Sequence, residues 1–178
     1  MELVVPSAKY KESFLQALAE YRQENVSAWD TRADLKDLNP EVLEKDFTAY
    51  INKLVEAAKG IGLPTGYVAH TSYWLIDNNE FIGRVDIRHS LAEKLLKEGG
   101  HIGYDIRPLK RNQGYGKKIL QLALPKAKAL EITKVLVTCD ETNIASKKVI
   151  ERNGGFFEDA VLVAEGRPKK LRYWFALS

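Results

Sequence analysis

The sequence has only one cysteine, Cys139, among its 178 residues, and only three histidines. A single cysteine excludes an intrachain disulfide, and His70, His89 and His101 are too scattered to give the paired spacing of a zinc site. We therefore expect no disulfide framework and no metal centre, and a protein that belongs in a reducing compartment.

Long apolar runs are missing from the start of the chain. The segment MELVVPSAKYKESF has an acidic residue at position 2 and no apolar run of about seven residues or more. It resembles neither a signal peptide nor a membrane span, so the sequence predicts a cytoplasmic protein without a membrane partner.

A surplus of one charge sign is lacking as well. Lys and Arg number 27 against 24 for Asp and Glu, which leaves a net charge of +3. The basic stretches LKRNQGYGKK and KKLR are too short to predict a nucleic-acid partner. With 45% hydrophobic residues and no repeat or linker, the chain predicts a single domain over residues 1–178.

Turn and capping signals divide the chain into alternating strands and helices. ELVV predicts a short strand, Ser7 caps a first helix, and Asn39 with Pro40 begins a second helix that Gly60 ends. The later elements are a hairpin over 71–89 that turns at Asn78 and Asn79, helices over 91–98, 114–130 and 143–153, strands over 101–107 and 134–139, and two strands around EGRPKK. This order predicts an α/β fold, a central mixed sheet flanked by helices.

The stretch HIGYDIRPLKRNQGYGKKIL joins a strand to a helix through a basic, glycine-containing loop. A helix start exposes unpaired N–H groups at its positive end, and Gly114 and Gly116 let an anion approach this backbone. Four cations add charge: Lys110, Arg111, Lys117 and Lys118. The loop therefore predicts phosphate binding, although neither the P-loop nor the dinucleotide glycine pattern fits it.

The pattern R-x-x-G-x-G, formed by Arg111, Gly114 and Gly116, resembles the pyrophosphate-binding motif of the GCN5-related N-acetyltransferase (GNAT) family. The segment CDETNIASKKVIERNGGFFE resembles the family's next segment, with Asn143 after the strand and Ser146 three positions on. The resemblance implies a GNAT-like fold and an acetyl-CoA-dependent N-acetyltransferase that acts on a primary amine of a small molecule or peptide. A homodimer is left open.

The same resemblance implies where acetyl-CoA is held. Its pantetheine arm would lie between the strands 101–107 and 134–139, bonded to main chain, with the pyrophosphate over the glycine loop. The implied contacts are Tyr104, Ile106, Arg111, Asn112, Gln113, Gly114, Tyr115, Gly116, Lys117, Asn143 and Ser146.

The implied chemistry is direct attack of the amine on the thioester, with a main-chain N–H near Tyr104 stabilising the oxyanion. His89 and Asp86 are the two candidates for the base, and they lie on opposite faces of VDIRH. His101 is also expected to titrate near neutrality. At the position of Ile150, many family members carry a tyrosine that donates a proton to the leaving sulfur. Isoleucine cannot donate a proton, so water, Ser146 or Tyr104 would take this role.

Other features leave alternatives open. Ile150 lends support to a non-catalytic acyl-CoA-binding sensor or scaffold module, and Cys139 is read as a buried small residue rather than a nucleophile. The segment from Glu20 to Asp46 contains eight acidic and four basic residues, and this negative surplus would suit a cationic amine. Trp29, in an aperiodic segment, is a candidate substrate contact.

Overall fold

The fold is described from a computed structural model, for residues 1–24, 35 and 38–177. The chain begins with β1 (Glu2–Val4), the 3₁₀ turn η1 (Ala8–Tyr10), α1 (Lys11–Gln23), α3 (Pro40–Lys45) and α4 (Phe47–Ala57). It continues with β2 (His70–Asp77), β3 (Glu80–Arg88), α5 (Glu93–Glu98), β4 (Ile102–Ile106), the turn η2 (Pro108–Lys110) and α6 (Tyr115–Ala129). The last elements are β5 (Lys134–Asp140), α7 (Ile144–Arg152), β6 (Phe156–Val161) and β7 (Lys170–Ala176).

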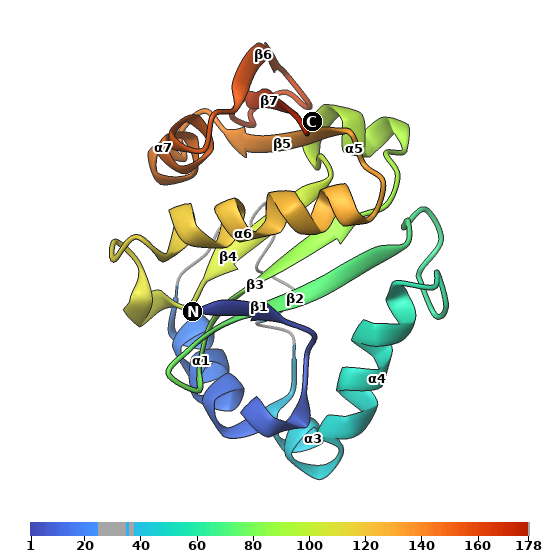
Figure 1. Ribbon diagram of the computed structural model, residues 1–178, viewed down its shortest axis with the longest axis vertical. Coiled ribbons are helices and arrows are strands. Elements are labelled where there is room, and N and C mark those ends of the chain that lie inside the picture. The colour runs from blue at the N-terminus through green and yellow to red at the C-terminus, as the bar shows by residue number, and fades with distance from the viewer. Residues whose placement is uncertain (25–34, 36–37, 178) are drawn as a thin grey trace.

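Two antiparallel sheets make up the strand framework, in the orders β1-β2-β3-β4 and β5-β7-β6. The edge strands β4 and β5 meet between the sheets and run in the same general direction (Figure 1). The predicted element order and α/β class are therefore confirmed. The mixed character lies at the β4/β5 junction, because all the ladders within the two sheets are antiparallel.

The hairpin of β2 and β3 has the predicted turn. Asn78 and Asn79 adopt φ values of 48° and 62°, which short polar side chains tolerate better than other residues do.

The second predicted helix differs from the prediction, because it is divided at Asp46. Lys45 ends α3, and the Asp46 side chain accepts a 2.9 Å bond from the Ala49 N–H, which caps α4. A carboxylate that serves as an N-cap favours a new helix start, so the chain turns there instead of continuing.

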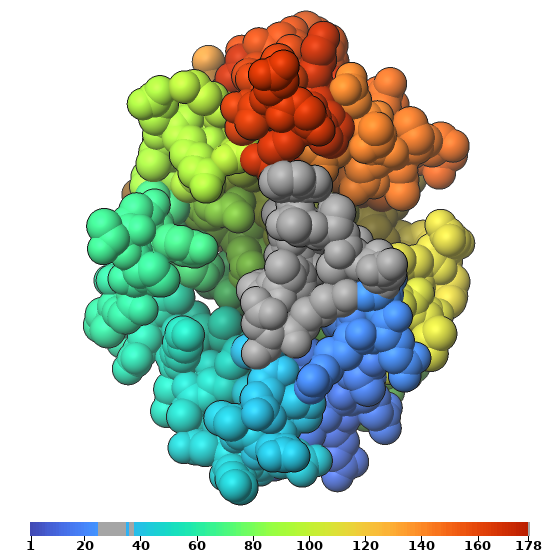
Figure 2. Space-filling view, turned by 180° about the vertical axis from the view of Figure 1, so that it is seen from behind, coloured from blue at the N-terminus to red at the C-terminus, as the bar shows by residue number. Residues whose placement is uncertain are grey.

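Helices cover both faces of the first sheet. Figure 1 shows α6 on one face and α1, α3 and α4 on the other. An aromatic cluster fills the second face, where Phe14 of α1 stacks on Trp74 at 4.9 Å and Phe47 of α4 packs against both. Seen from behind, the N-terminal helices and the C-terminal strands lie at opposite ends of the molecule (Figure 2). This packing fixes α1 and α4 against the face that carries Asp86.

Candidate active site

The outer edge of β4 presents main-chain groups that its own sheet does not use. The Arg107 N–H donates to the Ile82 carbonyl at 2.9 Å, so the antiparallel register directs the odd positions of β4 toward β3. Tyr104 and Ile106, at even positions, direct their N–H and C=O groups away from β3, on the side where β5 lies (Figure 1). The Ile106 carbonyl already accepts a 2.9 Å bond from Arg111 Nε.

His101 joins β4 to β5 just before this edge. Its N–H donates to the Leu136 carbonyl at 2.7 Å, and its Nδ1 accepts from the Leu136 N–H at 2.9 Å. Burial, with the nearby Arg88 charge, lowers the pKa of His101 to about 4. The expectation that His101 titrates near neutrality is therefore wrong, since this ring is a neutral hydrogen-bond acceptor.

Tyr104 of β4 and Ser146 of α7 are in contact. Their hydroxyl oxygens lie 3.0 Å apart, and burial raises the pKa of Tyr104 well above its ordinary value. Ser146 lies in the first turn of α7, where its N–H donates to the Asn143 side chain at 3.0 Å. Tyr104, Ser146 and Asn143, three of the implied acetyl-CoA contacts, are thus linked by hydrogen bonds, and Asn143 caps α7.

The start of α6 offers main-chain N–H groups without a side-chain cap. The N-cap residue is Gly114, with φ 87°, which has no side chain to accept a hydrogen bond from these N–H groups. A Cβ added to Gly114 would have no heavy atom within 4 Å. Asn112 also has a positive φ, 61°, and is exposed. A Cβ on Gly116 would lie 3.2 Å from Val149, so this glycine also lets α6 pack against α7.

The four loop cations are not equally available. Lys110 pairs with Glu80 at 2.6 Å, and Arg111 pairs with Glu24 through both oxygens. Lys117 is exposed, and no salt bridge within the described part of the chain involves it. Arg111 therefore holds the loop against α1, while Lys117 offers its charge to solvent.

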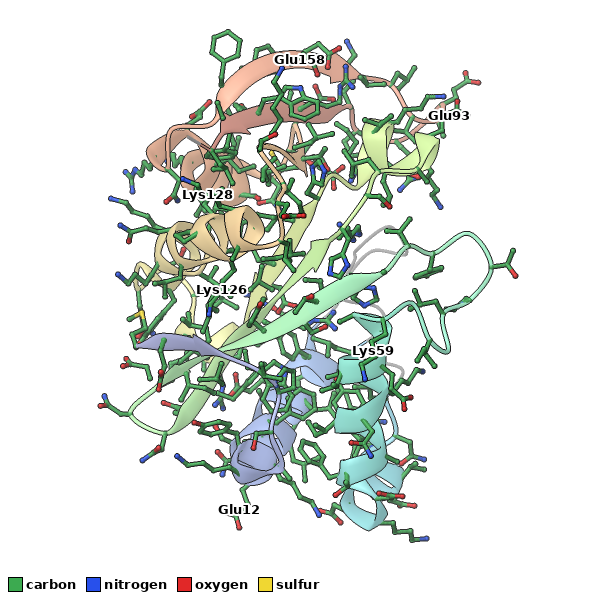
Figure 3. The ribbon with its side chains drawn as sticks, turned by 45° about the vertical axis from the view of Figure 1, so that its right-hand side comes forward. Glu12, Lys59, Glu93, Lys126, Lys128 and Glu158 are labelled. Atoms are coloured by element: carbon green, nitrogen blue, oxygen red, sulfur yellow. The ribbon has the colours of Figure 1, made fainter. Side chains whose placement is uncertain are left out.

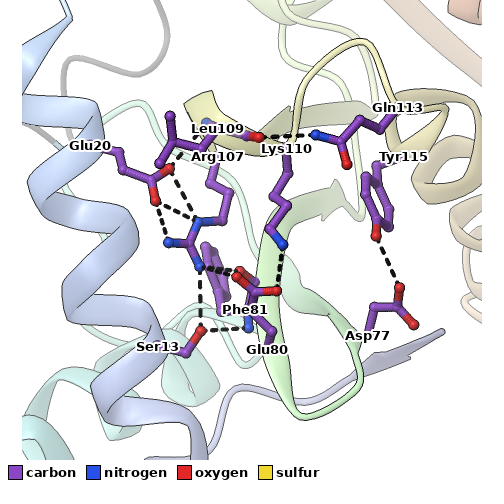
Figure 4. A network of polar contacts seen from close by, with 10 residues as sticks. All are labelled: Ser13, Glu20, Asp77, Glu80, Phe81, Arg107, Leu109, Lys110, Gln113 and Tyr115. Carbon is purple, nitrogen blue, oxygen red and sulfur yellow. Dashed lines mark hydrogen bonds and ion pairs between the residues drawn. The ribbon is translucent and has the colours of Figure 1, made fainter.

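Arg107, which was not among the predicted site residues, anchors the loop to α1 and β3 (Figure 4). Its guanidinium is buried and bonds to Glu20 of α1, to Glu80 at 3.0 Å and to the Phe81 carbonyl at 3.1 Å. Glu20 also accepts from the Leu109 N–H at 3.2 Å. The available signal was a charged residue that ends an apolar strand directly before a proline.

Two further predicted loop residues face the protein. Gln113 Nε2 donates to the Leu109 carbonyl at 3.0 Å, and the Tyr115 hydroxyl donates to Asp77 at 3.0 Å (Figure 4). The first contact braces the loop internally, and the second fixes the first turn of α6 to the end of β2.

A cavity of about 90 Å³ lies between α4 and the face of β2 and β3. In it, Asp86 accepts a 2.6 Å bond from the Ser72 hydroxyl. Arg84 donates to Asp105 at 3.1 Å, and Asp105 also accepts from the Tyr21 hydroxyl of α1. Its lining residues are Tyr50, Leu54, His70, Ser72, Trp74, Arg84 and Asp86.

His89, the other candidate base, does not line this cavity. It follows β3, where its N–H donates to the Ala69 carbonyl at 2.9 Å, and its Nε2 lies 2.8 Å from the Thr71 hydroxyl. On that face Lys126 of α6, labelled in Figure 3, lies 5.3 Å from the Tyr73 ring centroid. Burial lowers the pKa of His89, with a smaller contribution from His70. The structure thus places Asp86 and His89 on opposite faces.

Cys139 and Ile150 have surroundings that exclude acid–base roles for them. Burial raises the pKa of the Cys139 thiol to about 11, and Ile150 is completely buried in the core. The reading of Cys139 as a packed small residue agrees with this environment.

The acidic surplus of the N-terminal helices is partly neutralised. Glu20 and Glu24 form ion pairs with Arg107 and Arg111. Trp29, Asp30, Asp34 and Asp37 lie outside the described residues.

Within the described ranges, no cluster of three or more His, Cys, Asp or Glu side chains is arranged to hold a metal ion. None of the helices described there has the length and apolarity needed to span a bilayer.

The free β4 edge, the glycine loop and the uncapped start of α6 form an arrangement suited to a ligand that carries amides and phosphates. The profile described as "Acetyltransferase (GNAT) domain" matches residues 10–155. The chain belongs to the GNAT acetyltransferase family, and this membership supports acetyltransferase activity with an acyl-CoA donor.

Solved structures share the fold at low sequence identity. The Microcin C7 self immunity acetyltransferase MccE, in complex with acetyl-CoA and AMP, is 14% identical with a TM-score of 0.70, covering 98% of this chain and 91% of that one. RimL, a ribosomal L7/L12 alpha-N-protein acetyltransferase in complex with CoA, is 18% identical with a TM-score of 0.65, covering 98% and 93%. The Salmonella typhimurium acetyltransferase that modifies the N-terminal serine of L7/L12 is 18% identical, with a TM-score of 0.63 and coverage of 99% and 94%. The search of curated proteins found no match.

Proposed function

We propose that the chain, as a single domain over residues 1–178, is an acetyl-CoA-dependent N-acetyltransferase. It moves an acetyl group to a primary amine of a small molecule or peptide by direct attack in a ternary complex. The observation that carries this proposal is the β4 edge, where main-chain groups of Tyr104 and Ile106 face β5 beside the uncapped start of α6.

The residues present fit acetyl-CoA. The Tyr104 N–H and C=O and the Ile106 N–H form a short strand edge, to which the amide-bearing pantetheine arm would bind as an added strand. Gly114 leaves open space over the first N–H groups of α6, and Lys117 adds a charge that no ion pair in the described residues uses, a combination suited to a pyrophosphate. Acetyl-CoA supplies the activated thioester carbonyl.

Tyr104 has two roles in this proposal. Its main-chain N–H would donate to the oxygen that becomes negative in the transition state. Its buried hydroxyl has Ser146 as partner and a raised pKa, so it stays protonated at neutral pH and would give the leaving thiolate a hydrogen bond rather than its proton. A thiolate is only weakly basic, so it can leave without an acid at the position of Ile150.

Asp86 is the favoured base. It lines the cavity from β3 opposite Gly103 of β4, and Ser72 orients its carboxylate. Tyr50, Leu54 and Trp74 give this cavity an aromatic and apolar part, while His70, Ser72 and Arg84 give it a polar part. The carboxylate of Asp86 would accept the proton that the amine must lose before attack. His89, on the face toward α6, remains the alternative base.

The names of the solved relatives support an amine acceptor of either kind, since they include an N-terminal protein acetyltransferase and a microcin self-immunity enzyme. Within the same proposal the protein works in the cytoplasm, without nucleic acid or membrane. Size-exclusion chromatography tests whether it forms a homodimer.

One observation favours a second function, a non-catalytic acyl-CoA-binding sensor or scaffold. Ile150 is fully buried where many family members carry an acid. This alternative predicts CoA binding without any amine-dependent release of the free thiol.

Titration of CoA, acetyl-CoA and ATP, followed by a thiol-release assay over amines and peptides, tests the proposal. We expect both CoA forms to bind and ATP not to bind. Lys117→Glu should weaken CoA binding by about tenfold, or about 1.4 kcal/mol, because it places a like charge beside the phosphates. Lys53→Glu, an equally exposed change on α4, is the matched control and should bind normally. Absence of CoA binding would refute the proposal, and binding without thiol release would favour the sensor.

A further inference from the structure

We propose that His101 is a positioning residue for the acyl-CoA site, whose ring fixes the point at which β4 and β5 part. This inference rests on the proposed function, because it assigns His101 a role in holding the donor rather than in the chemistry.

His101 makes a reciprocal pair with one residue of the neighbouring strand. Its N–H donates to the Leu136 carbonyl at 2.7 Å, and its Nδ1 accepts from the Leu136 N–H at 2.9 Å. In a regular ladder a main-chain carbonyl would accept that second bond. The side chain replaces the carbonyl, so β4 is joined to β5 at this residue without a continuing ladder. Only 8% of His101 is exposed, which holds the ring in place.

The backbone around His101 is built for this contact. Gly100 has φ 64°, and a Cβ there would lie 2.5 Å from the Leu136 carbonyl oxygen. Arg88 donates to the Gly100 carbonyl at 3.0 Å, and the Thr138 hydroxyl donates to the Glu98 carbonyl at 3.1 Å. The segment that precedes His101 is therefore fixed to both neighbouring strands, to β3 through Arg88 and to β5 through Thr138.

The position of Tyr104 depends on this junction. Tyr104 follows His101 by three residues on the same strand, and its main chain forms the edge proposed to bind the pantetheine arm. Without an acceptor, the buried Leu136 N–H is left unsatisfied, and either water enters or the strands shift. Both changes alter the space between β4 and β5, while the cavity that holds Asp86 is lined by α4, β2 and β3 and by no residue of β4 or β5.

Three substitutions separate the acceptor atom from the rest of the ring. In His101→Asn the side-chain oxygen is attached to Cγ, as Nδ1 is in histidine, whereas in His101→Gln it lies one carbon further out and in His101→Leu it is absent. We expect CoA titration to give a dissociation constant within about threefold of wild type for Asn, and an increase of about tenfold or more for Gln and Leu. In the acetyl-transfer assay, KM for acetyl-CoA should rise in the same order while KM for the amine stays unchanged.

The matched control for lost stability is Leu43→Ala, a cavity in buried α3 that leaves the junction intact, and it should keep wild-type CoA affinity. Wild-type affinity in both Gln and Leu variants, or equal losses in Asn and Leu, would overturn the inference. If the Leu variant does not fold, the polar Asn and Gln pair decides the question alone. Failure of the wild-type protein to bind CoA is a distinct result that overturns the proposed function and this inference together.

Discussion

Burial keeps three ionisable side chains near the β4/β5 opening neutral. It raises the pKa of the Tyr104 hydroxyl and of the Cys139 thiol, and it lowers that of His101 to about 4. A thiol with a pKa raised to about 11 carries little thiolate at neutral pH, which makes it a poor nucleophile. This agrees with the proposed direct attack by the amine.

The depressed pKa of His101 predicts a pH-dependent stability. The unfolded chain takes up a proton near the ordinary value of 6.5, while the folded protein resists it down to about 4. The stabilisation is therefore complete above pH 6.5 and is lost as the pH falls toward 4, by up to about 3 kcal/mol. Urea unfolding of wild type and His101→Asn at pH 7.5 and pH 4.5 measures this component, because asparagine does not titrate.

Other groups titrate over the same range in both proteins, so the difference between the two pH dependences is the quantity to compare. Parallel losses of stability in wild type and His101→Asn would show that His101 is already free to accept a proton in the fold.

At the scale of elements, the break between α3 and α4 places one wall of the cavity. Asp46 ends α3 and caps α4, and α4 then runs along the sheet with Tyr50 and Leu54 lining the cavity. A single continuous helix from Asn39 would direct these residues elsewhere, so a local capping bond has a consequence for the acceptor site.

Asp46→Ala should lower the free energy of unfolding by about 1 kcal/mol, the usual cost of losing a cap. For the proposed reaction it should also raise KM for the amine, with KM for acetyl-CoA unchanged. Asn39→Ala is the matched control, because it removes the cap of α3, which does not line the cavity. Equal effects of the two variants on KM for the amine would contradict this role of α4.

Local patterns were sufficient for the order of elements and for the glycine loop, because caps, turns and periodicity act within a few residues. Asn78 and Asn79 formed the predicted turn, while the contact between Tyr104 and Ser146 joins two residues that the family resemblance implied only as separate acetyl-CoA contacts. The His101–Leu136 pair was not predictable, since its bond joins positions 35 residues apart. The ion pairs of Lys110 with Glu80 and of Arg111 with Glu24 were not predictable either, because their partners lie far away in the sequence.

At the scale of the whole molecule, Arg107 links three separate parts of the chain. It directly follows β4, its guanidinium bonds Glu20 of α1, which is 87 positions away, and it reaches Glu80 at the start of β3. Its side chain is only 5% exposed, and that of Glu20 is 12% exposed. Breaking one partner of a buried ion pair leaves the other charge uncompensated, which costs far more than the loss of a surface pair.

We therefore expect Arg107→Met to lower the free energy of unfolding by about 3 kcal/mol, measured by urea denaturation at pH 7.5. Arg172→Met is the matched control, because Arg172 also holds a carboxylate through two bonds, but its partner Asp159 is 45% exposed, so the loss should be about 1 kcal/mol or less. The double variant Arg107→Met with Glu20→Leu should recover part of the loss, because it removes the stranded charge. Equal losses in the Arg107 and Arg172 variants would mean that the network holds the loop no more firmly than a surface ion pair does.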